Sequence, residues 1–242
     1  MFTMKPEITI RPCTTLPEFE QCIQLQKEVW GDSDRELVPQ HIFVVAAKTG
    51  GQILGAYDGE KMVGYLLGMV GLRDGVGYIH SHMAGVLPDY QNQSIGRRLK
   101  LAQREDAMAR GIALIEWTFD PLKLRNAYFN LVRLGAVVRK YLPDVYGTVS
   151  SHLDAGRPTD RLLAEWWIDS ARVQKILAGQ PDKPTPSGER IFVPATHQTL
   201  EVQTNVRQQF QALFAQGYAA TGVELNDAGM DYLLEPPQYF SI

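Results

Sequence analysis

Two histidines near the middle of the chain are the side chains whose type and spacing most directly suggest chemistry. His80 and His82 stand two residues apart in GYIHSHMAGVL, an apolar run that reads as a β-strand over residues 77–87. Side chains alternate along a strand, so both imidazoles are expected on one face of the sheet. Because histidine titrates near neutral pH, such a pair is suited to take a proton, directly or through water.

Two other interpretations of the pair stay open. The histidines can be structural, with their ring nitrogens satisfied by neighbouring groups. A His-x-His pair on one strand face also offers two zinc ligands, but the spacing of the other residues provides no third ligand. No metal is therefore predicted.

The next residues along the chain form a loop suited to an anion. The stretch VLPDYQNQSIGRRLK, residues 86–100, reads as a strand end, a polar loop and a helix that opens on Arg97 and Arg98. The first amides of a helix lack partners, and the helix dipole places positive charge there. We therefore expect the amides from Gln91 to Arg97 to bind phosphate oxygens. The simpler alternative is a surface helix with Ser94 as its N-cap.

The elements around these residues predict an α/β fold with a mixed central sheet and helices on both faces. A capping box, Thr15–Glu18, starts a helix that ends near Gly31. A long helix over residues 94–111 is expected to bury Ile95, Leu99, Ala102 and Ala109. Residues 38–51 fit a helix or a strand. Further strands are expected at 8–14, 53–59, 61–71, 112–119, 136–147 and 160–170, with a helix at 124–136. The strands at 53–59 and 61–71 flank a short turn, Asp58–Glu60, which is a hairpin signal.

The composition changes near residue 178. The stretch 178–190 contains three prolines and two glycines and reads as a linker or a long surface loop. We therefore predict a main domain over residues 1–177 and a C-terminal strand-helix-strand extension over residues 191–242 that packs on it.

The loop and the element order together resemble a known family. Residues Val86–Gly96 are similar to the V-x-P-x-x-(Arg/Gln)-x-x-G-x-(G/A) signature of the GNAT N-acetyltransferase superfamily, placed after the fourth expected strand. Asn126, Ala127 and Leu134–Ala136 resemble the N…A…G-F stretch of that family. The resemblance covers residues 7–170 and implies a GNAT-like fold. Residues beyond 175 lie outside it.

The resemblance implies a cofactor and the residues that hold it. The cofactor would be acetyl-CoA or another acyl-CoA. The fourth strand would bind the pantetheine through its backbone around Val86, and Asn126 would also contact the cofactor. The pyrophosphate would lie on the loop residues Gln91, Asn92, Gln93, Ser94, Ile95, Gly96 and Arg97.

Ser94 departs from the family signature, which has glycine at this position. Serine keeps the amide, is small, and its hydroxyl is able to donate to a phosphate oxygen. Glycine is used where the backbone approaches a phosphate closely or where φ is unusual. Serine is therefore expected to exclude a left-handed φ here.

The catalytic residues are also inferred from the resemblance. His82 stands four residues before Val86, as does the His-x-His of the arylalkylamine N-acetyltransferases, which relays protons. Leu131 stands where many members have a tyrosine that protonates the departing thiolate, so Tyr128, one turn earlier, is a substitute candidate. Glu116 is a second candidate base. Trp166, Trp167 and His152 either line an acceptor pocket or serve packing.

The prediction is an acyl-CoA-dependent N-acyltransferase in which an amine attacks the thioester directly. An acyl-CoA-binding module without catalysis and a protein–protein element built on the tail are the alternatives. The net charge of -3 argues against nucleic acid, and no apolar run reaches the ~20 residues of a membrane helix. We expect a small-molecule amine acceptor and a reducing cytoplasm with Cys13 and Cys22 unpaired. The prediction allows for a homodimer.

Overall fold

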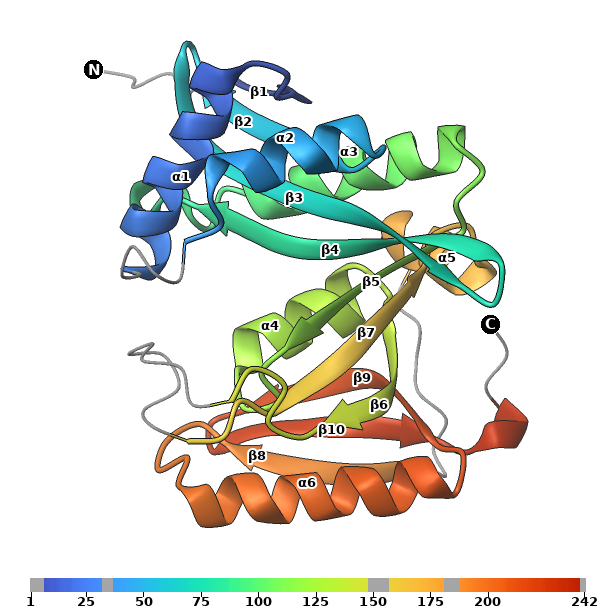
Figure 1. Cartoon of the computed structure of the whole chain (residues 1–242). Coiled ribbons are helices and arrows are strands. Elements are labelled where there is room, and N and C mark those ends of the chain that lie inside the picture. Colours follow the sequence, from blue (N-terminus) through green and yellow to red (C-terminus); the bar gives the residue numbers. More distant parts are fainter. Residues whose placement is uncertain (1–6, 32–36, 148–156, 181–187, 240–242) are drawn as a thin grey trace. The chain divides into compact units, whose positions relative to one another are not determined.

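The computed structural model describes residues 7–31, 37–147, 157–180 and 188–239 of the chain. The described residues form two compact units, Met1–Ile115 and Glu116–Ile242. Figure 1 shows the elements of both units in chain order. Residues 181–187 of the predicted linker and His152 lie outside the described residues.

Four antiparallel strands form the sheet of the first unit, in the order β1-β2-β3-β4. The predicted hairpin between β2 and β3 is confirmed, since Asp58 pairs with Lys61 across the turn and Gly59 adopts a φ of +60°. The strands are β1 (Ile8–Pro12), β2 (Gln52–Asp58), β3 (Lys61–Arg73) and β4 (Val76–Val86).

The helices of the first unit are α1 (Leu16–Trp30), α2 (Gln40–Lys48) and α3 (Ile95–Ala109). The carboxylate of Glu18 accepts a hydrogen bond of 2.9 Å from the amide of Thr15, as the predicted capping box requires. Gly31 ends α1 in the left-handed conformation. The structure also decides between helix and strand for residues 38–51 in favour of a helix.

These helices lie on opposite faces of the sheet. A side-chain carbon on Gly85 of β4 would lie 2.8 Å from Trp30 of α1, whereas one on Gly68 of β3 would lie 2.8 Å from Gln103 of α3. Tyr65 pairs with Gly85 and also contacts the Trp30 ring edge-on, at 6.2 Å between ring centroids. Tyr65 and Gly68 are three residues apart on one strand, so α1 and α3 face opposite sides.

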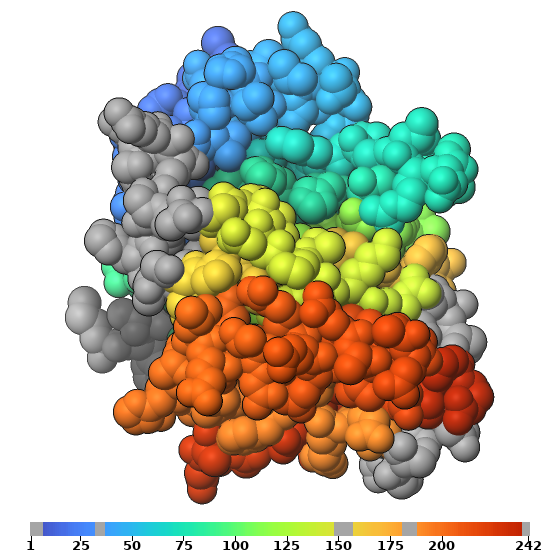
Figure 2. Space-filling view, turned by 60° about the horizontal axis from the view of Figure 1, so that its bottom comes forward, coloured from blue at the N-terminus to red at the C-terminus, as the bar shows by residue number. Residues whose placement is uncertain are grey.

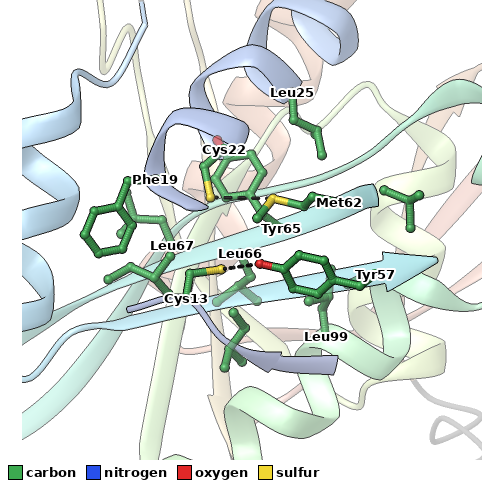
Figure 3. Close-up of a cluster of buried hydrophobic side chains, with 14 of the residues drawn as sticks. Cys13, Phe19, Cys22, Leu25, Tyr57, Met62, Tyr65, Leu66, Leu67 and Leu99 are labelled. Carbon is green, nitrogen blue, oxygen red and sulfur yellow. Dashed lines mark hydrogen bonds between the residues drawn. The ribbon is translucent and has the colours of Figure 1, made fainter. Parts of the chain in front are cut away.

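The apolar core of this unit combines residues of α1, α2 and α3 with residues of the sheet, and Figure 3 shows part of it. Cys13 and Cys22 are both buried and free, as expected. The Cys13 thiol lies 3.4 Å from the hydroxyl of Tyr57, and that of Cys22 lies 3.7 Å from the sulfur of Met62. Both cysteines therefore act as small core residues.

The buried face of α3 differs from the prediction. Ile95 and Leu99 are buried as expected, but Ala109 is exposed. Lys100 and Gln103 are buried instead. The burial of these polar residues is explained by polar partners on the sheet, which a pattern of apolar residues does not reveal.

The described residues of the second unit form six strands in the order β5-β7-β6-β9-β10-β8. Ala220 of β9 pairs with Val138 of β6, so the segment after the predicted linker joins this sheet. In that segment a strand and a helix are followed by two further strands, where the sequence predicts one or two. The strands are β5 (Leu114–Phe119), β6 (Val137–Leu142), β7 (Arg161–Trp167), β8 (Glu189–Pro194), β9 (Ala219–Asn226) and β10 (Gly229–Glu235).

Three helices accompany this sheet. Helix α4 (Leu124–Tyr128) continues into a π-helical turn, Phe129–Arg133. Helix α5 (Ala171–Leu177) is not predicted from the sequence, because its seven residues are too few for a clear hydrophobic period. Helix α6 (Leu200–Ala215) matches the predicted C-terminal helix and leaves one side at the surface, seen in orange in Figure 2.

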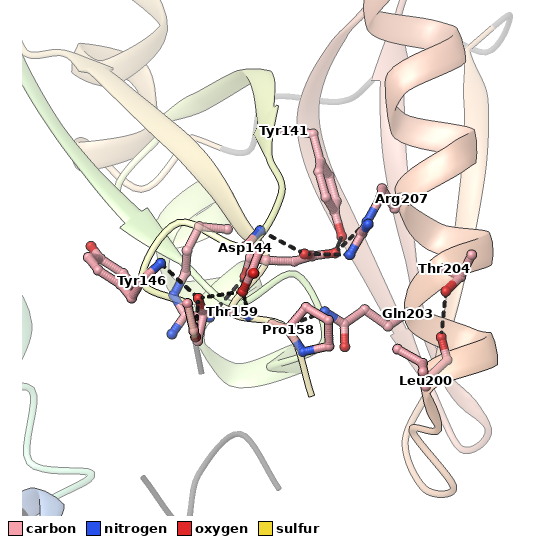
Figure 4. Close-up of polar contacts among 12 residues, drawn as sticks. Tyr141, Asp144, Tyr146, Pro158, Thr159, Leu200, Gln203, Thr204 and Arg207 are labelled. Atoms are coloured by element: carbon pink, nitrogen blue, oxygen red, sulfur yellow. Dashed lines mark hydrogen bonds and ion pairs between the residues drawn. The ribbon is translucent and has the colours of Figure 1, made fainter. Parts of the chain in front are cut away.

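Helix α6 is fixed to the sheet by aromatic and polar contacts. The ring of Phe210 lies 5.0 Å from that of Tyr232 and 5.8 Å from that of Tyr141, measured between centroids. The guanidinium of Arg207 forms two hydrogen bonds, of 2.7 and 2.9 Å, with the carboxylate of Asp160, which also accepts one of 2.6 Å from the Tyr141 hydroxyl (Figure 4). The amide of Asp144 also donates to this carboxylate, at 3.1 Å. We call Asp160, Arg207, Tyr141 and Asp144 the aspartate network.

The arrangement confirms the predicted fold class, an α/β protein with a largely antiparallel sheet and helices. None of the helices in the described ranges has the length and apolarity needed to span a membrane.

Candidate active site

The two histidines lie on β4, where the strand contains a β-bulge. Leu67 of β3 pairs with Met83, but the next residue, Gly68, pairs with Ser81, so His82 is the extra residue of the bulge. The imidazoles of His80 and His82 are neighbours, with ring centroids 6.2 Å apart. Bulges re-aim side chains and are frequent beside active sites.

The electrostatic surroundings of His82 favour its neutral form. Its side chain is exposed at the surface, yet nearby protein atoms still displace part of its hydration. This desolvation, with a smaller contribution from the charge of His80, lowers the pKa of His82 below its ordinary value. At neutral pH the imidazole therefore retains the lone pair that a proton acceptor needs.

The loop after β4 is held in place by its own side chains. A short 3₁₀ turn, Pro88–Tyr90, comes directly after the strand. The side-chain amide of Gln91 donates to the carbonyl of Val86, and that of Gln93 donates to the carbonyl of Asp89, each at 3.2 Å. These bonds direct the two glutamine side chains back onto the preceding residues, so the loop presents its backbone.

Asn92 and Ser94 both adopt left-handed backbone conformations, with φ values of +60° and +63°. The expectation that serine excludes such a φ is therefore wrong. A left-handed residue other than glycine costs roughly 1–2 kcal/mol, and the loop that must turn into α3 imposes this cost. Ser94 stands at the N-cap of α3, but its side chain makes no capping hydrogen bond. Its conformation, not its hydroxyl, shapes the loop.

The loop leaves hydrogen-bond donors without partners. Arg97 has a buried Nε that no acceptor among the described residues satisfies. Gly96 borders open space, because a side-chain carbon there would meet no neighbouring atom. Arg98 is different, since its guanidinium donates to the carbonyl of Ile8 at 2.5 Å. Among the described residues, six successive backbone amides also form no hydrogen bond with a backbone carbonyl. They belong to Asn92, Gln93, Ser94, Ile95, Gly96 and Arg97.

Such a group of donors fits an anion. Successive amides in and around a left-handed residue form a concave anion-binding surface, and the start of a helix adds its dipole. A buried guanidinium nitrogen without a partner is costly unless a ligand supplies an acceptor. The loop and Arg97 therefore suit the pyrophosphate of an acyl-CoA.

The other predicted site residues belong to the second unit. Glu116 is buried on β5, Asn126 is exposed on α4, and Tyr128 is partly exposed at the end of α4. Leu131 is fully buried in the π-helical turn. The position that carries the acidic tyrosine in the family is thus a core position here.

Trp166 and Trp167 differ in burial. Trp166 is fully buried, donates from its indole nitrogen to the carbonyl of Leu134 at 2.8 Å, and contacts Trp117 edge-on. It is a core residue. Trp167 is only partly buried, and its indole nitrogen has no acceptor among the described residues.

Sequence reasoning missed one feature behind the histidines. Lys100 and Ser81 are buried and hydrogen-bonded to each other. A sequence pattern for burial was present in α3. Residues four apart lie on the same side of a helix, so Gln103 shares the buried side of Ile95 and Leu99. Within the described ranges, no group of three or more His, Cys, Asp or Glu side chains is arranged to hold a metal ion.

Comparisons with known proteins agree with this geometry. Residues 15–129 match the family model for the acetyltransferase (GNAT) family. The ribosomal-protein-S18-alanine N-acetyltransferase of Escherichia coli is similar in structure, with a TM-score of 0.53 and 17% identity over 68% of this chain and 96% of that one. No curated protein sequence gave a match.

Two further solved structures have the same fold. Arabidopsis thaliana Naa50, solved with a bisubstrate analogue that contains CoA, gives a TM-score of 0.52 at 13% identity over 65% of this chain and 97% of that one. A GNAT-family acetyltransferase of Streptococcus pneumoniae gives 0.51 at 14% identity over 66% and 98%. Residues 15–129 of this chain therefore match the GNAT acetyltransferase family model, and the chain has the fold of these solved GNAT structures.

Proposed function

We propose that this protein is an acyl-CoA-dependent N-acyltransferase, with acetyl-CoA as the donor and a small-molecule amine as the acceptor, acting in the cytoplasm. The observation that carries the proposal is the loop 92–97, whose backbone amides and Arg97 Nε have no hydrogen-bond acceptor among the described residues. GNAT acetyltransferases as a family use acetyl-CoA, and one similar structure was solved with a CoA-containing analogue.

The loop residues are proposed to hold the pyrophosphate, and Val86 to offer backbone groups to the pantetheine. Asn126 is a further proposed cofactor contact. When bound, the cofactor supplies an activated acyl thioester, whose acyl carbon bonds to the amine as the thiol leaves. The chain itself contributes binding through charge and backbone amides, which does not require a metal ligand set.

The histidines are proposed to accept the proton that the amine must lose. His82 is suited to this role because its lowered pKa keeps it neutral at physiological pH. His80, whose ring lies 6.2 Å away, is proposed to relay the proton onward through water. Glu116 is the alternative base, and Tyr128 is the proposed donor to the thiolate in place of the buried Leu131.

The cofactor assignment is tested by placing a negative charge in the loop. Ser94→Asp puts a carboxylate beside the proposed pyrophosphate, so it is expected to weaken acetyl-CoA binding at least about tenfold through like-charge repulsion. Gln24→Asp on the exposed side of α1 is the matched control. Calorimetry with acetyl-CoA provides the affinities. Equal affinity for Ser94→Asp and the wild type contradicts the phosphate assignment.

The catalytic assignment is tested with His82→Gln and His80→Gln, alone and together, over pH 6 to 9 and with a panel of amines. Loss of a positioned general base is expected to lower turnover about 10²–10⁴-fold. Affinity for acetyl-CoA should stay the same, because neither imidazole is assigned to the cofactor. If the double variant retains full turnover and the wild-type pH profile, the histidines are structural and Glu116 becomes the candidate base.

A further inference from the structure

A lysine is buried between α3 and the sheet of the first unit. Lys100 is 4% exposed, and its amine donates to the hydroxyl of Ser81 at 2.7 Å and to the side-chain oxygen of Gln103 at 3.3 Å. Lysine is almost never fully buried, because removing an ammonium group from water is costly. Desolvation accordingly lowers the pKa of Lys100 well below its ordinary value.

Lys100 belongs to a continuous chain of polar side chains. The amide of Gln103 donates to Gln52 at 3.0 Å, and the amide of Gln52 donates to the carboxylate of Asp106 at 2.6 Å. Gly68 leaves the room for this contact, since a side-chain carbon there would lie 2.8 Å from the Gln103 amide. We call Lys100, Ser81, Gln103 and Gln52 the lysine network. Its members hold one another in fixed orientations.

The lysine network ends at the bulge of β4. Ser81, which accepts from Lys100, immediately precedes His82, the extra residue of the bulge. A bulge has fewer ladder hydrogen bonds than a regular strand, so its backbone needs other contacts to fix it. The hydroxyl of Ser81 provides such a contact from the α3 side of the sheet. Ser81 thus holds the backbone directly beside the residue that carries the His82 imidazole.

The same helix also carries the proposed phosphate loop. Lys100 lies six residues after Ser94, so α3 contacts the loop with its first turn and the bulge with its second. The helix thus connects the two parts of the proposed site that lie in the first unit.

We propose that Lys100 is a positioning residue that, through Ser81, holds the bulge of β4 so that His82 faces the acceptor amine. The inference rests on the proposed function for the role of His82. The structural part, that Lys100 sets the surroundings of the His82 imidazole, stands independently of any turnover.

The test compares Lys100→Met, Ser81→Ala and the double variant, with Lys48→Met at an exposed position as control. Three measurements are made on each: the titration of the His82 imidazole by NMR, the affinity for acetyl-CoA by calorimetry, and turnover with its pH profile. Urea unfolding confirms that each variant is folded. If Lys100→Met does not fold, Ser81→Ala tests the same bond with a smaller change.

In both single variants we expect the His82 titration midpoint to move from its wild-type value and the acid limb of the pH profile to move with it. Turnover should fall by up to about 10²-fold, as for a misplaced catalytic group, while the affinity for acetyl-CoA stays within about threefold. The double variant should lose no more than the worse single variant, because both changes remove one interaction.

The proposal is overturned if folded Lys100→Met or Ser81→Ala retains the wild-type His82 titration, or if the losses of the two variants add. It is also overturned if acetyl-CoA affinity falls as much as turnover. If wild type itself turns over no amine, the proposed function fails. The His82 titration then still decides whether Lys100 sets the surroundings of His82.

Discussion

Each of the two units buries an ionisable residue within a polar network, but the hydrogen-bond partners of that residue differ. In the aspartate network of the second unit, Asp160 is 1% exposed and is bound by the guanidinium of Arg207. In the lysine network of the first unit, Lys100 donates to a hydroxyl and an amide oxygen. The hydrogen bonds from Arg207 to Asp160 join opposite charges, whereas those from Lys100 to Ser81 and Gln103 reach neutral groups.

The two networks shift the pKa of the buried group by different balances of forces. Burial alone would raise the pKa of Asp160, but hydrogen bonds from Tyr141 and Arg207 outweigh it and lower that pKa, so the charged form is the stable one. For Lys100, desolvation lowers the pKa and disfavours the charged form. The aspartate network therefore stabilises its unit, whereas the lysine network imposes a cost beside the candidate active site. Costs of this kind are concentrated at functional sites.

The sharpest test of this contrast is Asp160→Ala. The change leaves the guanidinium of Arg207 and the hydroxyl of Tyr141 without their acceptor, so we expect a loss of about 3–5 kcal/mol in the free energy of unfolding, measured in urea. Arg190→Ala is the control, because its pair with Glu224 is exposed at 52% and 55% and should contribute less than about 1 kcal/mol. Equal losses in the two variants would break the contrast.

Both networks should make the free energy of unfolding depend on pH, but over different pH ranges. The unfolded chain binds more protons at Lys100 than the folded one, so the free energy of unfolding should rise as pH increases from the lowered folded pKa towards ~10.4. Lys100→Met should abolish this rise. For Asp160 the stabilisation is complete above ~3.9 and is lost as pH falls through the lower folded pKa. Urea unfolding at a series of pH values measures both, with Lys48→Met as control.

The left-handed backbone of Ser94 supplies a further test, because its strain is expected to destabilise the folded first unit. Ser94→Gly removes the side chain from a left-handed position, so the free energy of unfolding should rise by about 0.5–1 kcal/mol. Ser94→Ala keeps the strain and should give no gain. Thermal unfolding followed by circular dichroism compares the two variants. A loss of stability in Ser94→Gly would show that the serine side chain, and not its backbone, matters.

The smallest expected effect concerns the proposed boundary at residues 178–190. Segments rich in proline and glycine lack ladder hydrogen bonds, so limited proteolysis should cut first there. Mass spectrometry of the early fragments locates the cut. An early cut within α6 or β9 instead would argue against the boundary and for a single cooperative second unit.

The main elements can be read from local patterns, but the shorter ones cannot. The capping box at Thr15, the hairpin at Gly59 and the strand around His80 each depend on a few neighbouring residues, and the sequence predicts all three. Helix α5 and the π-helical turn at Phe129–Arg133 are too short to show a period and are fixed by packing. The bulge at His82 is invisible in one strand, because it exists only in the pairing of two.

The sequence by itself determined the order of the main elements, the polar loop after β4 and the resemblance to GNAT enzymes, because periodicity, turn residues and the Val86–Gly96 motif are local properties. Tertiary structure alone decided that Ser94 is left-handed, that Lys100 is buried behind Ser81, and that Arg98 is engaged by Ile8. Each of these depends on loop closure or on contacts between residues far apart in the chain, and none has a signature in neighbouring residues.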